Sequence, residues 1–372
     1  MKLNLSFLLL ALGTLACNTK SETQNHPVKS NLEILVGTYT GEGSDGIYSV
    51  QFDPTTGVLS DKKLLVETAN PSFIARSKNH EIVFSVNETQ EGGVSSFAWD
   101  ETKELLKLVS RRDSQGDYPC YLSLNPEESF VSIANYGTGN VITYPIDQAG
   151  VISTKGMIKQ HEDTGPNPER QEGPHAHFSM FSNDGKNIYT VDLGIDQVIK
   201  YPVHGSEIGA GVIALSLESG DGPRHLAFHP TLPIVYVITE LTNMIVTASI
   251  DSAGIFQANH RISTLPKDFE GESYCADIHV SEDGRYLYAS NRGHNSIAIF
   301  SIAEDGSLDM IATEPAYGDW PRNFALTPDN NYLLVANQRS NNITVFQRDS
   351  ATGMLYYTSQ QIEISQPVCL IF

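Results

Sequence analysis

The sequence predicts an all-β protein, a seven-bladed β-propeller, from three observations. A segment pattern recurs six times along the chain, each copy reads as short strands joined by tight turns, and the two chain ends complement each other as parts of a seventh copy. A linear solenoid is the alternative, but stacked repeats would not explain why the two ends complement each other.

The repeat is clearest in GPRHLAFHP, which begins at Gly222. Related segments begin at Asn70, Tyr118, Gly173, Tyr274 and Trp320. The copies lie 46 to 55 residues apart when they are aligned on Pro71, Pro119, Pro174, Pro223, Cys275 and Pro321. Asp-Gly, Pro-Asp and Gly turns separate alternating apolar and polar runs, as β-hairpins require. No 3.6-residue periodicity indicates long helices.

The two ends of the chain supply the missing unit. The C-terminal QPVCLIF resembles a first strand, and its Pro367 lies 46 residues after Pro321. The segment ILVGTYTGEGSDGIYSVQFD, from Ile34, resembles strands two and three of the same unit. Joining the ends removes open edge strands, so we expect one domain over residues 31–372.

The N-terminus reads as an export signal. Residues 1–16 carry Lys2 and the apolar run Leu5–Leu12, which is too short to span a membrane. The small residue before Cys17 resembles a bacterial lipoprotein box, so we expect a signal peptide over 1–16, a lipidated Cys17 and a polar tether over 17–30. An ordinary cleaved signal peptide is the alternative. The expected location is the cell envelope, on the periplasmic side or in the outer membrane, with membrane contact only through the lipid.

Composition narrows the classes of partner and cofactor. The net charge of −20 argues against nucleic acid as a partner, because phosphate backbones select basic surfaces. An odd set of three further cysteines, Cys120, Cys275 and Cys369, argues for core thiols over a disulfide framework. HExxH, paired CxxC, P-loop, GxGxxG and GxSxG motifs are absent, so we expect no metal, no cofactor and no serine nucleophile. We expect a monomer.

The head of the first strand in each blade should face the central channel. Arg224 holds this position in GPRH, and the repeat alignment assigns its equivalents as Ser72, Cys120, His177, Ala276, Arg322 and Val368. One step further along lie His225, Asp277 and Asn323. A second set, at the end of the second strand, contains Glu240, Glu88, Arg292 and Gln338. The Asn residues that precede several of these read as turn formers.

Five charged or titratable side chains should therefore gather near one mouth: His177, Arg224, Glu240, Asp277 and Arg292. One interpretation is a structural network of two ion pairs, Arg224–Glu240 and Asp277–Arg292. The other is a cationic pocket with one or two acid–base groups. His175 should lie close to the same mouth.

Several motifs resemble one family over nearly the whole mature chain. They are VGTYT, HAH, GPRHLAFHP, Glu240-Leu241, DIHVSEDGRYLYASNRGH and PRNFALTPDNNYLLVANQ. Together they resemble the seven-bladed propeller lactonases, which include propeller-type 6-phosphogluconolactonases and 3-carboxy-cis,cis-muconate lactonizing enzymes. This chain has Thr239 where the family often has Asn, and HAH where it often has HPH.

The resemblance implies a lactone hydrolase that acts on a small anionic sugar-acid lactone. It implies His177, Arg224, Glu240 and Arg292 as catalytic residues, and with the ring positions it suggests substrate contacts from His175, His225, Asp277, Arg322 and Gln338. His177 is the favoured general base, because a Glu flanked by two Arg is a weak base. A muconate-type cycloisomerase and a non-enzymatic binding propeller are the alternatives. Export conflicts with a cytoplasmic phosphorylated substrate, so unphosphorylated or carboxylated lactones also fit.

Overall fold

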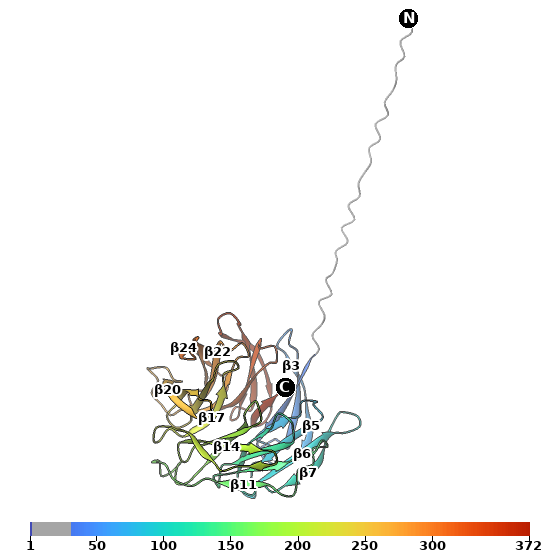
Figure 1. The fold of residues 1–372 in the computed structure, drawn as a ribbon. Coiled ribbons are helices and arrows are strands. Elements are labelled where there is room, and N and C mark those ends of the chain that lie inside the picture. Colours follow the sequence, from blue (N-terminus) through green and yellow to red (C-terminus); the bar gives the residue numbers. More distant parts are fainter. Residues whose placement is uncertain (2–30) are drawn as a thin grey trace.

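The chain folds into a ring of seven antiparallel sheets, as predicted (Figure 1). The computed structural model describes Met1 and residues 31–372. The expected signal peptide, Cys17 and the tether fall largely on residues 2–30, outside the described residues. All regular elements in the described part are β-strands, and none of its segments is a helix long and apolar enough to cross a membrane.

Each sheet forms one blade, in which the strands follow one another from the channel outwards. The closing blade contains β29 (Pro367–Ile371), β1 (Leu32–Thr38), β2 (Gly46–Phe52) and β3 (Leu59–Glu67). Blade 1 contains β4 (Ile74–Arg76), β5 (Ile82–Asn87), β6 (Gly93–Trp99) and β7 (Leu106–Arg112). Blade 2 contains β8 (Pro119–Leu124), β9 (Phe130–Asn135), β10 (Asn140–Pro145) and β11 (Met157–Gln160). Blade 3 contains β12 (Ala176–Phe181), β13 (Asn187–Asp192), β14 (Gln197–His204), β15 (Glu207–Ile208) and β16 (Val212–Ser216).

The remaining three blades have four strands each. Blade 4 contains β17 (Pro223–Phe228), β18 (Ile234–Thr239), β19 (Met244–Ile250) and β20 (Phe256–Ser263). Blade 5 contains β21 (Tyr274–Val280), β22 (Tyr286–Arg292), β23 (Ser296–Ile302) and β24 (Leu308–Pro315). Blade 6 contains β25 (Pro321–Leu326), β26 (Tyr332–Asn337), β27 (Asn342–Arg348) and β28 (Leu355–Glu363).

The closing blade joins the two ends of the described chain. The C-terminal β29 pairs antiparallel with β1, with Val36 opposite Leu370 and Gly37 opposite Cys369. In Figure 1 the C-terminal end accordingly lies among the N-terminal strands. Because the strand that closes the ring comes from the other end of the sequence, the ring stays closed only while this pairing holds.

The core lies between neighbouring blades. The second strands β5, β9, β18 and β26 are buried along their whole length, because both of their faces pack on adjacent sheets. The outer strands are more exposed, as the pattern of β20 illustrates. Cys120, Cys275 and Cys369 are free and buried in this arrangement, in keeping with the core interpretation.

In six of the seven blades, a bulge in the innermost strand turns one side chain into the channel. In every blade except blade 1, the pairing of the innermost strand with its neighbour skips at the position that the sequence alignment assigned to the channel. In blade 4 the skip lies between Pro223 and His225, so Arg224 is the extra residue. A bulge re-aims the side chain of its extra residue. We call Ser72, Cys120, His177, Arg224, Ala276, Arg322 and Val368 the first ring.

The alignment needs one correction, in blade 3. Ala176, not Pro174, pairs with the end of the second strand in the way that Pro223 does, because the pairing there joins Ala176 to Asp192.

In blade 4, Gly222 precedes the bulged strand with φ at 57°, and a Cβ there would lie 2.4 Å from Leu241 Cγ. Glycine at this position therefore permits both the turn and the close packing.

A second layer lies one residue further along the inner strands. It consists of Phe73, Tyr121, Phe178, His225, Asp277, Asn323 and Cys369. The ring centroid of Tyr121 lies 4.1 Å from that of Phe73, 4.3 Å from that of Phe178 and 5.3 Å from that of His225. These packed rings form a floor below the first ring.

Candidate active site

The centre of the site is the carboxylate of Glu240, which follows β18. Its Oε2 lies 3.0 Å from Arg224 Nε and 2.7 Å from Arg292 Nη2. Its Oε1 accepts a hydrogen bond of 2.6 Å from Arg170 Nη2. Three guanidinium groups from three different parts of the chain thus surround one carboxylate.

These charges are almost fully removed from solvent. Glu240, Arg224 and Arg292 are at most 5% exposed. Burial raises the pKa of Glu240, but the charges of Arg292, Arg224 and Arg170 outweigh that effect and hold the pKa below its usual value. Burial, together with the charges of Arg292 and Arg322, lowers the pKa of Arg224 to about 10. Glu240 is therefore an ionised anchor and a poor proton acceptor.

Arg322 adds a further cation at the same end of the channel. Its guanidinium carbon lies 5.3 Å from the ring centroid of Tyr39, and the Tyr39 hydroxyl donates to Glu88 at 2.8 Å. Within residues 31–372 no carboxylate lies within ion-pairing distance of Arg322. Burial lowers the pKa of Arg322, but its interactions with Tyr39, Glu88 and Glu240 outweigh that effect and raise the pKa above its usual value.

His177 lies beside this cationic group. Its ring is 5.3 Å from that of His225 and 5.7 Å from that of Tyr136, measured between centroids. Burial and the charge of Arg224 lower the pKa of His177 well below its usual value, so the imidazole is neutral at pH 7. Its buried Nδ1 has no hydrogen-bond partner among the described residues.

Other unpaired polar atoms occupy first-ring and second-strand positions in other blades. Ser72 Oγ in the first ring and Gln338 Oε1, the equivalent of Glu240 in blade 6, are buried without a partner in the described chain. Buried polar groups are normally hydrogen-bonded, and an exception needs an explanation such as a catalytic role or a ligand. Among the preceding Asn residues, Asn135 and Asn291 donate through Nδ2 to backbone carbonyls of the chain that leads into their own blade, although Asn135 Oδ1 is itself buried without a partner in the described chain. That contact fits the interpretation of the Asn set as turn formers.

Sequence patterns missed Arg170 and Tyr136. Arg170 belongs to the long connection between β11 and β12, and its Nη2 also lies 3.4 Å from the Tyr136 hydroxyl. Tyr136 stacks on His175, with 4.5 Å between ring centroids, and His175 Nε2 pairs with Glu172 at 3.2 Å. His175 is therefore close to the mouth, as expected. Tyr136 was detectable as the blade 2 equivalent of Glu240, whereas no repeat covers the loop that carries Arg170.

Of the two ion pairs in the structural interpretation, Arg224–Glu240 is present and Asp277–Arg292 is wrong. Arg292 pairs with Glu240, and Asp277 lies in the second layer, where it binds His225 Nδ1 at 2.9 Å and His279 Nε2 at 3.0 Å. The reason is the bulge, which leaves Ala276 in the first ring and moves Asp277 one level down. His225 and Asp277 accordingly lie beneath the group around Glu240.

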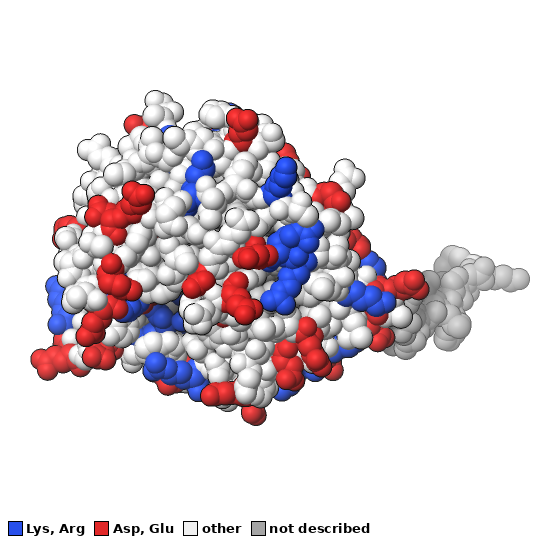
Figure 2. Space-filling model, turned by 90° about the horizontal axis from the view of Figure 1, so that it is seen from below, with Lys and Arg blue, Asp and Glu red and all other residues white. Residues whose placement is uncertain are grey.

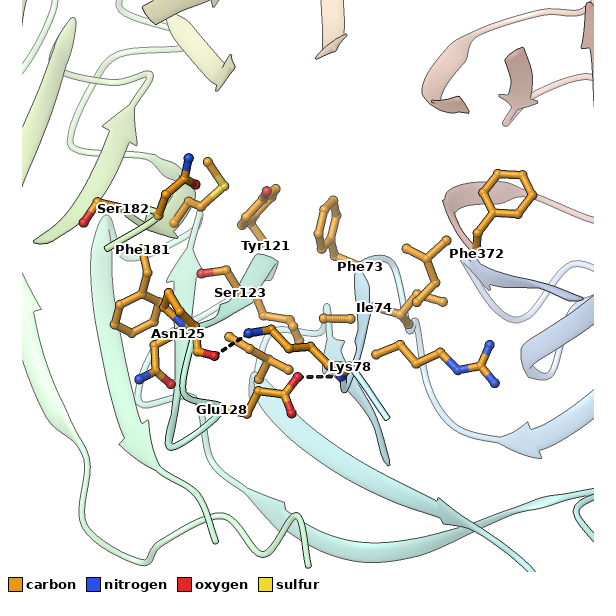
Figure 3. Close-up of a pocket in the computed structure, with 18 residues that line it drawn as sticks. Phe73, Ile74, Lys78, Tyr121, Ser123, Asn125, Glu128, Phe181, Ser182 and Phe372 are labelled. Carbon is orange, nitrogen blue, oxygen red and sulfur yellow. Dashed lines mark hydrogen bonds between the residues drawn. The ribbon is translucent and has the colours of Figure 1, made fainter. Parts of the chain in front are cut away.

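The opposite end of the channel is chemically different. A cavity of about 700 Å³ opens where the inner strands of blades 1 to 3 end, lined by apolar groups such as Phe73, Tyr121 and Phe372 (Figure 3). Lys78 Nζ donates to Pro126 O, another residue of the lining, and Arg76 pairs with Glu33. Phe73, Tyr121 and Met180 also line a neighbouring cavity that contains His225, Asp277 and His279.

The positive charge of the site is local and internal. On the face seen in Figure 2, acidic and basic side chains are interspersed, whereas the guanidinium groups of Arg224 and Arg292 are buried. Within the described residues, no three His, Cys, Asp or Glu side chains gather in a way that could hold a metal ion. The described groups at this mouth are the cations Arg224, Arg292 and Arg322, the neutral imidazole of His177, and the carboxylates of Glu240 and Glu88.

The fold and the site together define an enzyme-type propeller whose channel mouth carries several buried cations. The family model described as "Lactonase, 7-bladed beta-propeller" matches residues 33–372. The chain belongs to this seven-bladed β-propeller lactonase family, which confirms the resemblance and the expected lactone-hydrolase class.

Individual relatives agree with this assignment. A 6-phosphogluconolactonase of Bacillus subtilis is 35% identical, and the alignment covers 91% of this chain and 97% of that protein. The crystal structure of a putative 6-phosphogluconolactonase from Bacteroides uniformis has a TM-score of 0.86 at 36% identity, covering 92% of this chain and 99% of that one. A periplasmic gluconolactonase from Pseudomonas aeruginosa has a TM-score of 0.87 at 29% identity, covering 92% and 99%.

Proposed function

We propose that this protein hydrolyses an anionic sugar-acid lactone, in the manner of a 6-phosphogluconolactonase, at the cationic mouth of its channel. The observation that carries the proposal is the arrangement around Glu240. A structural ion-pair network would be satisfied internally, whereas here Arg322 contacts the Tyr39 ring without an ion-paired carboxylate, and His177 Nδ1 has no hydrogen-bond partner among the described residues.

The cations have two roles in this proposal. Arg322 binds the anionic end of the substrate, because a planar guanidinium forms strong bidentate bonds with phosphate and carboxylate. Arg224 and Arg292, held by Glu240, stabilise the negative charge that develops on the lactone carbonyl oxygen. The floor below the first ring limits access of the substrate to this one mouth.

His177 is the general base. Its neutral ring takes a proton from water while the water oxygen attacks the lactone carbonyl carbon, which gives a tetrahedral oxyanion. When the ring C–O bond breaks, the imidazolium returns the proton to the departing alkoxide oxygen. General-base assistance of this kind contributes roughly 10²- to 10⁴-fold. Glu240 is unsuited to this step, because three guanidinium groups lower its pKa.

The anionic group of the substrate is the least constrained feature. Export of the chain, if the N-terminal signal acts as expected, favours a lactone found outside the cytoplasm, such as an unphosphorylated aldonolactone or a carboxylated lactone. Retention in the cytoplasm favours 6-phosphoglucono-δ-lactone. The unpaired Arg322 favours a charged substrate over a neutral one in either location.

The test is hydrolysis of a lactone panel by residues 18–372. The panel contains 6-phosphoglucono-δ-lactone, glucono-δ-lactone and a carboxymuconolactone, and acid release is followed against the uncatalysed background. Turnover that His177→Ala and Arg224→Ala both abolish, with the fold intact, supports the proposal. Equal rates in wild type and Arg224→Ala would remove the role of that cation. Product analysis separates hydrolysis from cycloisomerisation.

A further inference from the structure

Arg224 contacts blade 5 and the second layer in addition to Glu240. Its Nη1 donates to the Ala276 carbonyl and lies 3.3 Å from His225 Nε2. A guanidinium has no acceptor and remains protonated, so His225 Nε2 must offer a lone pair in this contact. The proton of a neutral His225 then lies on Nδ1.

Asp277 is placed to enforce that arrangement. Its Oδ1 lies 2.9 Å from His225 Nδ1, and an ionised carboxylate only accepts. Burial raises the pKa of Asp277, but the charge of His279 and the hydrogen bonds from His225 and His279 outweigh it and keep the carboxyl ionised. Burial and the charge of Arg224 lower the pKa of His225 to about 4, so the ring is neutral at pH 7.

We propose that Asp277 and His225 are positioning residues for Arg224. Asp277 fixes the tautomer of His225, and the bare Nε2 of His225 then orients the guanidinium that serves the lactone. The inference rests on the proposed function, because it assigns the oriented Arg224 to substrate. Neither residue contacts the reacting atoms in this arrangement, which replaces the expectation that both bind substrate directly.

The network also has a structural role that the test must separate. Asn323 Nδ2 donates to Asp277 Oδ2 at 2.6 Å, and Leu370 N donates to Asn323 Oδ1 at 2.7 Å. Asp277 of blade 5 therefore contacts His225 of blade 4 and Asn323 of blade 6, and Asn323 in turn contacts Leu370 of the closing blade. Loss of Asp277 alone therefore cannot distinguish positioning from stability.

The first experiment reads the tautomer directly. Nitrogen-15 NMR of histidine-labelled residues 18–372 at pH 7 reports which ring nitrogen carries the proton, and the signal missing in His225→Gln assigns His225. We expect a proton on Nδ1 and none on Nε2. A proton on Nε2, or on both nitrogens, overturns the inference whatever the protein hydrolyses.

The second experiment compares two replacements at position 225. The Gln amide oxygen can accept from Arg224 at the place of Nε2, whereas Leu cannot. Provided that the two variants have the same melting temperature, we expect His225→Leu to lose about 10- to 100-fold in kcat/KM. His225→Gln should retain several-fold more activity than His225→Leu. Equal losses would overturn the positioning role. If no lactone is turned over, the same comparison is made on the Kd of 6-phosphogluconate, so failure of the proposed function leaves the inference testable.

Discussion

Arg224 Nε and Glu240 Oε2 lie 3.0 Å apart inside the channel, and the same carboxylate oxygen contacts Arg292 Nη2 at 2.7 Å. One buried anion thus holds two guanidinium groups that would otherwise repel each other. The charge proposed to act on the lactone and the stability of this mouth would then depend on the same contact.

Glu240→Gln should show how much this carboxylate contributes to the stability of the fold. Removing one partner of a buried ion pair typically costs about 3–5 kcal/mol, because the other charge is left uncompensated. We expect a lower free energy of unfolding in urea, partly restored by added phosphate, which can take the place of the carboxylate between the cations. An unchanged unfolding free energy without phosphate would contradict this role of the carboxylate.

His177→Gln should lower kcat by about 10²- to 10⁴-fold while the far-UV circular dichroism stays that of wild type. His260→Gln, at an exposed position on β20, is the matched control and should keep the wild-type rate. In wild type the acid limb of kcat/KM should fall well below pH 6.5, because burial and Arg224 lower the pKa of His177. A limb at or above pH 6.5 would argue against His177 as the base.

Arg322→Met should discriminate between charged and neutral lactones. Loss of a hydrogen-bonded charge corresponds to about 10- to 100-fold in affinity, so KM for 6-phosphoglucono-δ-lactone should rise by that factor. KM for glucono-δ-lactone should change far less. Arg339→Met is the control, since Arg339 is exposed and stacks on Trp320. A similar rise of KM for both lactones would assign Arg322 a structural role.

Stability should fall in mild acid because of His225. The folded pKa of about 4 lies below the unfolded value of roughly 6.5, so between these values the unfolded chain binds a proton that the folded chain excludes. Stability is therefore full above pH 6.5 and declines as the pH falls, by about 2 kcal/mol at pH 5. Urea unfolding at pH 7 and pH 5 should show a larger decline in wild type than in His225→Gln. Equal declines would show that His225 titrates normally.

Deletion of residues 367–372 should abolish cooperative unfolding, because it removes β29 and leaves β1 as an open edge. Deletion of Phe372 alone is the control, since this residue follows β29 and takes no part in its pairing. Differential scanning calorimetry distinguishes the two forms. A sharp transition in the larger deletion would mean that six blades are self-sufficient.

The fold was predictable because a propeller repeats its unit. Proline and turn residues recur at each strand head, so even the two half-units at the chain ends could be matched to the pattern. The same repetition located Arg224 and Glu240 in the channel, since equivalent positions face the same way in every blade.

The site was less predictable where the partners come from different blades. The alignment placed Ala276 in the first ring and Asp277 one step further along, but repeat positions alone do not show that Arg292 pairs with Glu240 and Asp277 with His225. The insertion before β12 similarly shifted the start assigned to blade 3. Arg170 lies in a loop without a counterpart in other blades, so no pattern could connect it with Glu240.

Because β29 closes the ring, the channel is complete only after this strand has been synthesised and has paired with β1. Asn323 receives its backbone partner from Leu370, and the blade beside Arg322 is complete only when the final residues are present. During translation β29 follows every other described strand. A nascent chain that lacks β29 can therefore hold Arg224, Glu240 and Arg292 without a closed channel around them.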